Sequence, residues 1–334
     1  MPIINKFSAD TTAANVDPAS VLFKARATNI RPLVNMLRSI FFRNRVSCAI
    51  NSGGIVFTVE EASSTVAQAY VRTDLFATFL YNVQLAHEQN RGRTDSQNEE
   101  GEETVHVVLP LDVLLDCLML FYGPASTAAG VTTGALTGSS GDLRGATTAH
   151  IAFNGLGTDF ELMLEERGII SVCRMATFEP EPTTDLDFAS SPVTQQLIIR
   201  SEWLRDAFNE LDPTSETVGI SMSPSRPYFR ISTTGDTGST EMTYSKDEHL
   251  DSFFCSEEHE NWYKLAQIQR CKHALSLSDK TKIRVNQRGF VSFQFMIPTD
   301  ADVSFVNFLF APQSVPDELC GVANHQRATE PPNH

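Results

Sequence analysis

The sequence lacks the features that mark membrane, secreted and nucleotide-binding proteins. Its most apolar segment, Val107–Tyr122, is interrupted by Asp112 and Asp116, so we expect no membrane span. The N-terminus has no basic start followed by an apolar run, so we expect no signal peptide. The phosphate-binding patterns GxxxxGKS and GxGxxG and the Gly-x-Ser-x-Gly elbow do not occur. We therefore expect no cofactor, and any ATP would be used by partners.

Cysteine pairs are missing as well. The six cysteines are widely spaced, include no CxxC pair, and several lie in apolar runs. This pattern indicates reduced thiols in the cytosol or nucleus rather than a disulfide framework. Four possible zinc ligands, Cys255, His259, Cys271 and His273, have the spacing C-x3-H-x11-C-x-H, which matches no common structural site. Because Cys271 also belongs to the apolar stripe of a predicted helix, we expect no metal site.

Acidic residues are nearly absent from two stretches of an acidic chain, whose 334 residues carry a formal net charge of −15. Residues 18–59 contain no Asp or Glu, and residues 262–288 contain Asp279 alone. Two basic islands in an acidic body predict a protein that meets a polyanion at one place and repels it elsewhere. The basic residues are Lys24, Arg26, Arg31, Arg38, Arg43 and Arg45 in the first island, and Lys264, Arg270, Lys272, Lys280, Lys282, Arg284 and Arg288 in the second.

The length and the 41% apolar content predict two folded domains. Two segments poor in apolar residues, 84–103 and 124–148, are typical of long surface loops. The acidic segment Phe178–Ser191 contains two prolines and is typical of an extended connector. The expected units are a mobile tail at 1–19, a first domain at 20–177 that holds both loops, a connector at 178–195, a second domain at 196–312 and a mobile tail at 313–334.

The two predicted domains share one order of elements, which indicates a duplication. Each begins with an apolar strand, a helix and a hairpin, and then adds further strands, a second helix and three closing strands. The matched elements are the strands Val21–Ala27 and Gln196–Arg200, the helices Asn29–Ile40 and Glu202–Leu211, the hairpins centred on Ser52–Gly54 and Pro224–Arg226, and the second helices Leu111–Tyr122 and Ile268–Ser276.

The first predicted helix carries basic residues on one side, whereas Arg205 of the third shares its side with acidic residues and the basic residues of the fourth are spread around its polar side. In the first helix, Arg31, Asn35 and Arg38 stand at i, i+4 and i+7, apart from the apolar stripe. The second helix differs, because its polar positions are Asp112 and Asp116, and it offers no basic contact. A plainer interpretation is that these charges only keep amphipathic helices soluble.

Several sequence blocks carry a resemblance to a known family. They are LLDCL (Leu114–Leu118), the EPEP and DLDF of Phe178–Phe188, SEWLRDAFNELDPTSE (Ser201–Glu216), SPSRPYFRISTTGDTGS (Ser223–Ser239) and QRGFVSFQFMI (Gln287–Ile297). In this order, over about residues 20–312, the blocks resemble the Rad-one family, which supplies one subunit of the nine-one-one checkpoint clamp. More distantly, FLFAP (Phe308–Pro312) resembles the closing strand of the proliferating cell nuclear antigen.

The resemblance implies an α+β fold of two similar sliding-clamp domains, with sheets outside and two helices per domain lining a DNA channel. Three subunits would close a six-domain ring, in a heterotrimer with two related but distinct subunits. An ATP-dependent clamp loader would open this ring around double-stranded DNA in the nucleus, and the ring would then recruit checkpoint and repair proteins. No catalytic residues are implied.

The resemblance also implies three kinds of site. Subunits of such rings join by pairing of edge strands, here Ile169–Ala176 and Thr237–Tyr244. A partner peptide would dock near Leu186, Ala311 and Pro312. Asp112 and Asp116 depart from an evenly basic channel. The expected DNA-facing residues are Arg31, Arg38, Arg205, Lys264, Arg270 and Lys272.

Two alternatives stay open. A DNA exonuclease could also use a basic surface, and two-metal nucleases need clustered carboxylates such as Asp159 with Glu161, or Asp185 with Asp187. Digestion of labelled DNA in the presence of Mg²⁺ would distinguish this activity. The second alternative is a homotrimeric replication clamp, which the long inserts and the Asp-bearing second helix disfavour.

Overall fold

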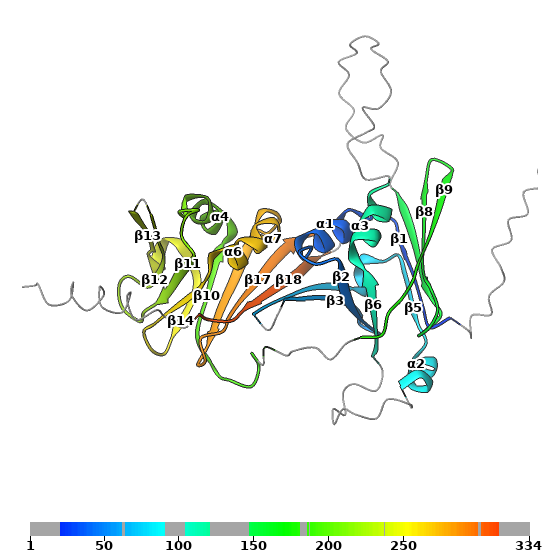
Figure 1. Ribbon diagram of the computed structural model, residues 1–334, viewed down its shortest axis with the longest axis horizontal. Helices are drawn as coiled ribbons and strands as arrows, with labels where there is room; N and C mark the ends of the chain where they lie inside the picture. The colour runs from blue at the N-terminus through cyan, green and yellow to red at the C-terminus, as the bar shows by residue number, and fades with distance from the viewer. Residues whose placement is uncertain are drawn as a thin grey trace, which may run out of the picture.

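The computed structural model describes residues 21–61, 64–90, 104–120, 147–180, 186, 188–236, 238–299 and 302–313. The expected tails, apart from Gln313, lie outside these ranges, as do residues 91–103 and most of the expected loop at 124–148. The molecule is elongated and dominated by sheets (Figure 1).

The first half of the chain contains nine strands and three α-helices in the part that the structure describes. Its elements are β1 (Phe23–Ala27), α1 (Arg31–Ser39), β2 (Arg45–Asn51), β3 (Gly54–Glu61), β4 (Thr65–Arg72), the 3-10 turn η2 (Thr73–Leu75), β5 (Thr78–Tyr81), α2 (Val83–Asn90), β6 (Val105–Pro110), α3 (Leu111–Met119), β7 (Thr148–Phe153), β8 (Phe160–Glu166) and β9 (Ile169–Met175).

The second half repeats this series. Its elements are β10 (Val193–Arg200), α4 (Ser201–Glu210), β11 (Thr217–Met222), β12 (Phe229–Gly235), β13 (Gly238–Tyr244), α5 (Lys246–His249), β14 (Leu250–Cys255), β15 (His259–Lys264), α6 (Leu265–Ile268), the 3-10 turn η3 (Gln269–Cys271), α7 (Lys272–Leu277), β16 (Lys280–Asn286), β17 (Val291–Pro298) and β18 (Val303–Phe310).

The two halves correspond element by element, which confirms the predicted duplication and the α+β fold. Strands β5-β1-β7-β8-β9 form one sheet, and β14-β10-β16-β17-β18 lie in the same relative order in the second half. Likewise β6-β2-β3-β4 matches β15-β11-β12-β13. The pairing register repeats as well. Lys24 of β1 pairs with Leu80 of β5, and Gln196, at the corresponding place in β10, pairs with Phe254 of β14.

One sheet joins the halves. Strand β18 pairs with β4 over six residues, from Phe305 opposite Tyr70 to Phe310 opposite Thr65. This pairing merges four strands of the first half with five of the second into a nine-stranded sheet. Aromatic rings of the two halves also meet here, since the Phe42 ring lies 6.5 Å from the Phe308 ring of β18 between centroids. The joint is therefore both hydrogen-bonded and packed.

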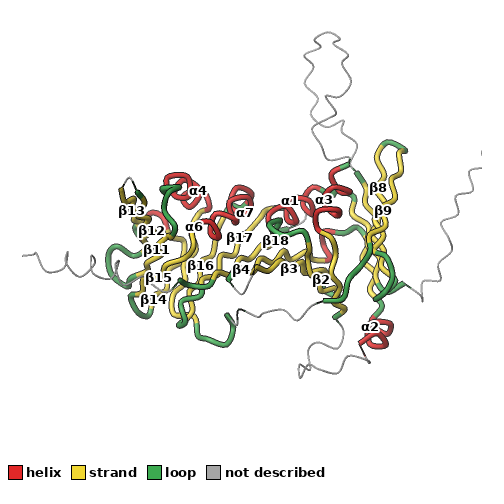
Figure 2. Tube along the Cα trace, in the orientation of Figure 1, coloured by secondary structure: helices red, strands yellow, loops and turns green. Residues whose placement is uncertain are grey.

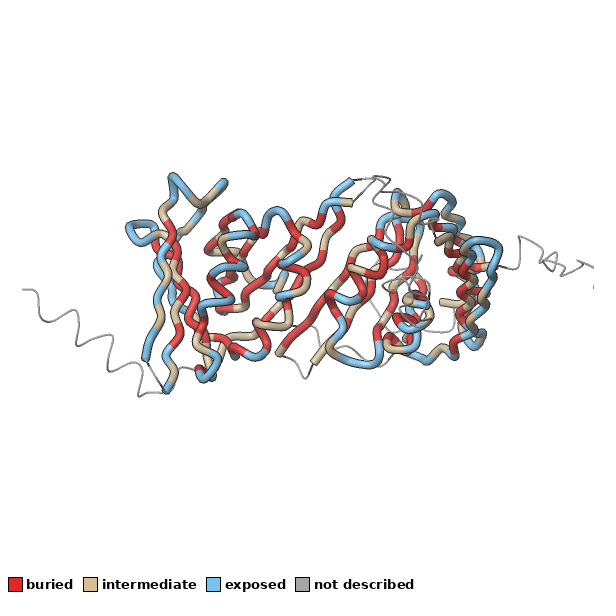
Figure 3. Tube along the Cα trace, turned by 90° about the horizontal axis from the view of Figure 1, so that it is seen from above, coloured by how far each residue is buried: buried red, intermediate tan, exposed pale blue. Residues whose placement is uncertain are grey.

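Most helices lie along one side of the molecule. Figures 1 and 2 show α4, α6, α7, α1 and α3 in a row over the sheets, and this row is called the helix layer below. Apolar residues at helical spacing cause this packing, because Leu33, Met36 and Leu37 of α1 are buried while Arg31 and Arg38 are exposed. Seen from above in Figure 3, exposed positions of the helices stand over buried strands.

Two predictions about local structure are wrong. The segment 84–103 was predicted to be a loop, yet Val83–Asn90 forms α2, because the Asn82 side-chain Oδ1 accepts hydrogen bonds from the Gln84 and Leu85 amides and Ala86 is buried. The predicted helix Ile268–Ser276 is divided into α6, η3 and α7. At this division the Cys271 thiol donates to the Ile268 carbonyl (2.9 Å), an oxygen that a continuous α-helix would use for its own ladder.

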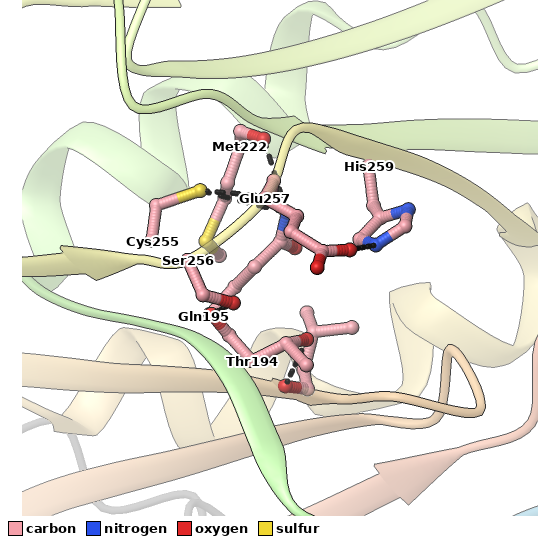
Figure 4. A network of polar contacts seen from close by, with 8 residues as sticks. Thr194, Gln195, Met222, Cys255, Ser256, Glu257 and His259 are labelled. Carbon is pink, nitrogen blue, oxygen red and sulfur yellow. Dashed lines mark hydrogen bonds and ion pairs between the residues drawn. The ribbon is translucent and has the colours of Figure 1, made fainter.

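A buried amide ties three elements of the second half together. Gln195 on β10 is only 1% exposed, and its Nε2 donates to the carbonyls of Met222 and Glu257, both at 3.0 Å (Figure 4). The same nitrogen lies 3.8 Å from the Cys255 Sγ. The side chain therefore holds β11 and the β14–β15 turn against the first strand of this half.

Replacing Gln195 with leucine should destabilise the protein by about 2 kcal/mol, because the volume is kept while two carbonyls lose their donor. The midpoint of urea unfolding measures this change. Gln196→Leu is the matched control, since the neighbouring side chain is partly exposed and is expected to change stability by less than about 0.5 kcal/mol. Equal midpoints for both variants would contradict the assignment.

Candidate nucleic-acid interface

Two arginines of α1 stand free on the exposed side of the helix layer. Pro32 lies in the first turn, where its missing N–H costs nothing, and the buried stripe leaves Arg31 and Arg38 pointing outward. The Asn29 side chain accepts a hydrogen bond from the Arg31 backbone amide (3.0 Å). An anion in solution can therefore reach both guanidinium groups.

The second half contributes further exposed cations. Arg205 of α4 is exposed, beside the acidic Glu202 and Asp206, and Lys264 and Lys272 are exposed at the two ends of the α6–η3 segment. Glu202 is itself bound by Arg200 at 3.0 Å. Arg205 and Lys272 thus lie on helices of the helix layer, as do the two arginines of α1, while Lys264 ends β15 directly before α6. Contact of these residues with DNA stays a prediction.

Arg270 is in a different situation. Its guanidinium forms an ion pair with Glu61 at the end of β3 and lies 4.9 Å from the centroid of the Phe42 ring. Arg43 binds the other oxygen of the same carboxylate at 2.9 Å. The structure therefore gives this predicted DNA-facing residue an acidic partner within the chain, from the opposite half.

The Glu61 carboxylate is anionic at neutral pH. The hydrogen bond from Arg270 holds the pKa of Glu61 below its ordinary value, with further lowering by the charges of Arg270 and Arg43, and only burial opposes this. Nearby, the Gln267 amide donates to the Ser64 hydroxyl at 2.8 Å, and the Ala311 amide donates to the Ser64 carbonyl at 2.9 Å. A polar junction therefore joins the two halves at the β3–β4 hairpin.

His273 connects α7 with α1. Burial lowers the pKa of His273, and the positive charge of Arg38 lowers it further. The ring is therefore neutral at pH 7, while Arg38 and Lys272 carry the charge beside it. The sequence predicted that Arg38 and Lys272 both face DNA. The effect of Arg38 on His273, which directly follows Lys272, shows that the end of α1 and the start of α7 lie close together.

The acidic helix α3 also belongs to the helix layer. Asp116 is exposed, and the Asp112 carboxylate accepts a hydrogen bond from the Val113 amide (2.8 Å). On its inner side, burial and contact with Cys173 of β9 raise the pKa of Cys117 to about 12. This helix therefore packs on the last strand of the first half while presenting negative charge outward.

The two basic islands do not form two confined surfaces, which corrects the sequence interpretation. Lys24 and Arg26 alternate with buried residues of β1, so they lie on the face of the sheet turned away from the helices. On β16, Lys282 and Arg284 alternate with buried residues in the same way. Strand periodicity in each island could have revealed this division, because alternate residues of a strand point to opposite faces.

The residues of the predicted partner pocket are placed as follows. Leu186 is 5% exposed, while Ala311 and Pro312 are partly buried after the end of β18. The Gln313 amide donates to the Trp262 carbonyl at 2.7 Å, so this C-terminal segment runs along β15. Docking of a peptide here stays a prediction.

Of the two carboxylates considered for catalysis that the structure describes, Asp159 is exposed and Glu161 is bound by an arginine. Glu161 contacts Arg174 on the neighbouring strand at 2.8 Å, and the two side chains are 43% and 64% exposed. Asp185 and Asp187 lie outside the described ranges. Within those ranges, no three His, Cys, Asp or Glu side chains gather as metal ligands would.

The four residues considered as zinc ligands do not gather as a metal site within the described ranges either. The Cys255 thiol donates to the Glu257 carbonyl at 3.1 Å, and His259 contacts the Glu257 carboxylate (Figure 4). Cys271 is fully buried in η3, where it belongs to the core.

The two predicted edge strands are confirmed as edges. β9 ends its sheet and β13 ends another, and the two strands lie at opposite ends of the molecule (Figure 1). Ile170 and Val172 of β9 are 59% and 53% exposed. The pair Phe160–Met175 corresponds to Val291–Phe310, so the counterparts of Ile170 and Val172 on the same face of β18 are Phe305, which is partly buried, and Asn307, which is 7% exposed with β4 beside it.

Comparison with known proteins agrees with this architecture. The model of the family described as Repair protein Rad1/Rec1/Rad17 matches residues 22–297. The chain belongs to this family. It is 37% identical over 297 residues to "Cell cycle checkpoint protein RAD1" of Homo sapiens, a match that covers 88% of this chain and 93% of that protein.

More distant relatives extend the comparison. Over 185 residues the chain is 26% identical to "DNA repair exonuclease REC1" of Mycosarcoma maydis, covering 46% of this chain and 40% of that one. The crystal structure of PCNA from Thermococcus kodakaraensis superimposes with a TM-score of 0.61 at 14% identity, covering 87% of this chain and all of that one. The fold is therefore that of the PCNA-like clamps. No helix among the described residues combines the length and the apolar character required to cross a membrane.

Proposed function

We propose that this Rad1-family chain is one subunit of a ring clamp that encircles double-stranded DNA, together with two related but distinct subunits. The observation that supports this proposal is that two edge strands lack a hydrogen-bonded neighbour in the described structure. β4 and β18 pair inside the chain, whereas their counterparts β13 and β9 have no neighbour on one side in the described structure. The joint between the halves is thus a template for the joint between subunits.

This geometry requires a head-to-tail assembly. The two open edges differ in sequence and lie at opposite ends, so β13 of one subunit would pair with a β9-like strand of the next. Such contacts either continue as a filament or close as a ring. The superposition on the whole PCNA chain supports closure.

In such a ring the helix layer would face the duplex. Arg31, Arg38, Arg205, Lys264 and Lys272 would lie near phosphates and contact them through charge and solvent, without reading bases. Encirclement keeps the protein on DNA by topology, so these contacts need not be tight. The exposed carboxylates of α3 suggest that the other subunits supply more of the positive charge.

The names of the relatives support a role in the nucleus, where checkpoint and repair proteins would use the ring as a platform. An ATP-dependent clamp loader would place the ring on DNA, because the chain has no nucleotide-binding motif of its own. The role of the chain itself is non-enzymatic in this proposal, since Glu161 of the strongest carboxylate pair is bound to Arg174.

Co-expression with the two candidate partner subunits tests the proposal. We expect a 1:1:1 complex by mass measurement in solution, and a monomer when the chain is expressed alone. A stable trimer of this chain alone would instead support the homotrimeric replication clamp.

A further inference from the structure

One acidic residue lies among the basic ends of the helix layer. The Glu61 carboxylate contacts Arg43, from the loop between α1 and β2, at 2.9 Å, and contacts Arg270 of η3 in the opposite half. The Glu61 side chain is 20% exposed, that of Arg43 is 52% exposed and that of Arg270 is 27% exposed. Water, and hence a competing anion, can reach this group.

The two charged groups that contact this carboxylate, Arg43 and Arg270, are both positive. Arg270 is followed by Lys272 on α7, and His273 brings α7 against Arg38 of α1. Glu61 itself comes from the end of β3, in the sheet beneath the helices. Glu61, a residue of the sheet, therefore neutralises two guanidinium groups, one from the loop after α1 and one from η3.

We propose that Glu61 withholds Arg43 and Arg270 from DNA phosphates by occupying both guanidinium groups as an intramolecular anion. This inference rests on the proposed clamp function, because it places DNA on the helix side. A phosphate and a carboxylate compete for the same donors of a guanidinium. Glu61 would thereby weaken the grip of this part of the channel, as a ring that slides along DNA requires.

A purely structural role for Glu61 is the simpler alternative. The ion pair crosses the joint between the halves, but the joint has other bonds, namely Gln267 to Ser64, Ala311 to Ser64 and the whole β4–β18 pairing. Loss of one charge-assisted contact leaves these in place. The two roles therefore make different predictions for DNA affinity.

The test uses the full chain, a labelled linear duplex of about 30 base pairs and a series of salt concentrations. Glu61→Gln keeps the shape of the side chain and removes its charge. We expect this variant to bind the duplex about threefold to tenfold more tightly near 50 mM salt, with a salt dependence steeper by about one to two counterions. In a background of Arg43→Gln with Arg270→Gln, the same change should have no effect.

Glu161→Gln is the matched control. It also removes one negative charge that is bound to an arginine, but on β8, where Glu161 alternates with buried residues and so lies on the face away from the helices. Equal tightening by both variants would show a general charge effect and overturn the proposal. Tightening by Glu61→Gln that persists without the two arginines would overturn it as well.

A second variant keeps the carboxylate. If Glu61 withholds Arg43, then Arg43→Gln should change DNA affinity by less than about twofold, whereas Arg31→Gln should weaken it clearly. A large loss in Arg43→Gln would contradict the inference while leaving the clamp function intact. If neither arginine variant changes the affinity, the result would contradict the placement of DNA on the helix side, and with it the proposed clamp function.

Discussion

Replacing Ile170 and Val172 with aspartate should abolish assembly of the chain with its ring partners. In the isolated chain both side chains are exposed, at 59% and 53%, so the substitutions leave folding intact. In the ring they would occupy the places that Phe305 and Asn307 hold beside β4, where Phe305 is partly buried and Asn307 is 7% exposed. The aspartate at position 172 would then bury an unpaired charge, and the one at position 170 would lose part of its hydration.

The expected loss is large because an uncompensated buried charge costs about 3–5 kcal/mol. One such charge already lowers the affinity of a joint by about a hundredfold or more. Size-exclusion chromatography of the co-expressed subunits measures the loss as disappearance of the 1:1:1 complex, and thermal unfolding checks that the variant chain is folded.

The matched control uses two other exposed apolar residues. Leu80 on β5 and Phe254 on β14 are 63% and 53% exposed, at equivalent register positions of the duplicated fold. They lie on outer edge strands that the proposed ring does not use. Leu80→Asp with Phe254→Asp should therefore assemble normally, and loss of assembly in this control with none in the β9 variant would refute the proposed joint.

The architecture was accessible from the sequence because the duplication repeats both the order and the spacing of elements. The strand, helix and hairpin that open each half are present near their predicted bounds, although β10 begins at Val193 rather than Gln196. The edges β9 and β13 were also correct. Periodic apolar residues determine these features locally, so one sequence is enough to find them.

Charge could not be placed in the same way. A count of basic residues treats Arg26 and Arg31 alike, yet a strand sends Arg26 to the outer face and a helix holds Arg31 on the helix layer. Arg270 shows a second limit, since its partner Glu61 lies 209 positions away and meets it only through the fold. Long-range ion pairs leave no local pattern in a sequence.

Helix α2 illustrates a third limit. A low content of apolar residues predicted a loop, but a helix of this kind needs only a cap and one buried contact, which Asn82 and Ala86 provide. An asparagine directly before Val83 was the available signal. The mean composition of the twenty residues 84–103 does not register this single capping residue.

Charge reversal at Arg31 and Arg38 should weaken retention of the assembled ring on closed circular DNA and leave its assembly unchanged. Both side chains are exposed on α1, and no joint between subunits uses that helix in the proposed ring. The double variant removes two phosphate contacts and adds two repulsive charges. We expect at least about tenfold less DNA-bound ring near 100 mM salt, with a shallower salt dependence.

The control for this prediction comes from the same basic island. Lys24→Glu with Arg26→Glu changes the net charge of the chain by the same amount, but these side chains lie on the sheet face turned away from the helices. If the helix layer faces the duplex, this variant should retain DNA almost normally, because exposed charges more than about 10 Å away are screened at 0.1 M salt. Equal losses in both variants would mean that total charge governs binding, and a loss in the β1 variant alone would place the DNA on the opposite face.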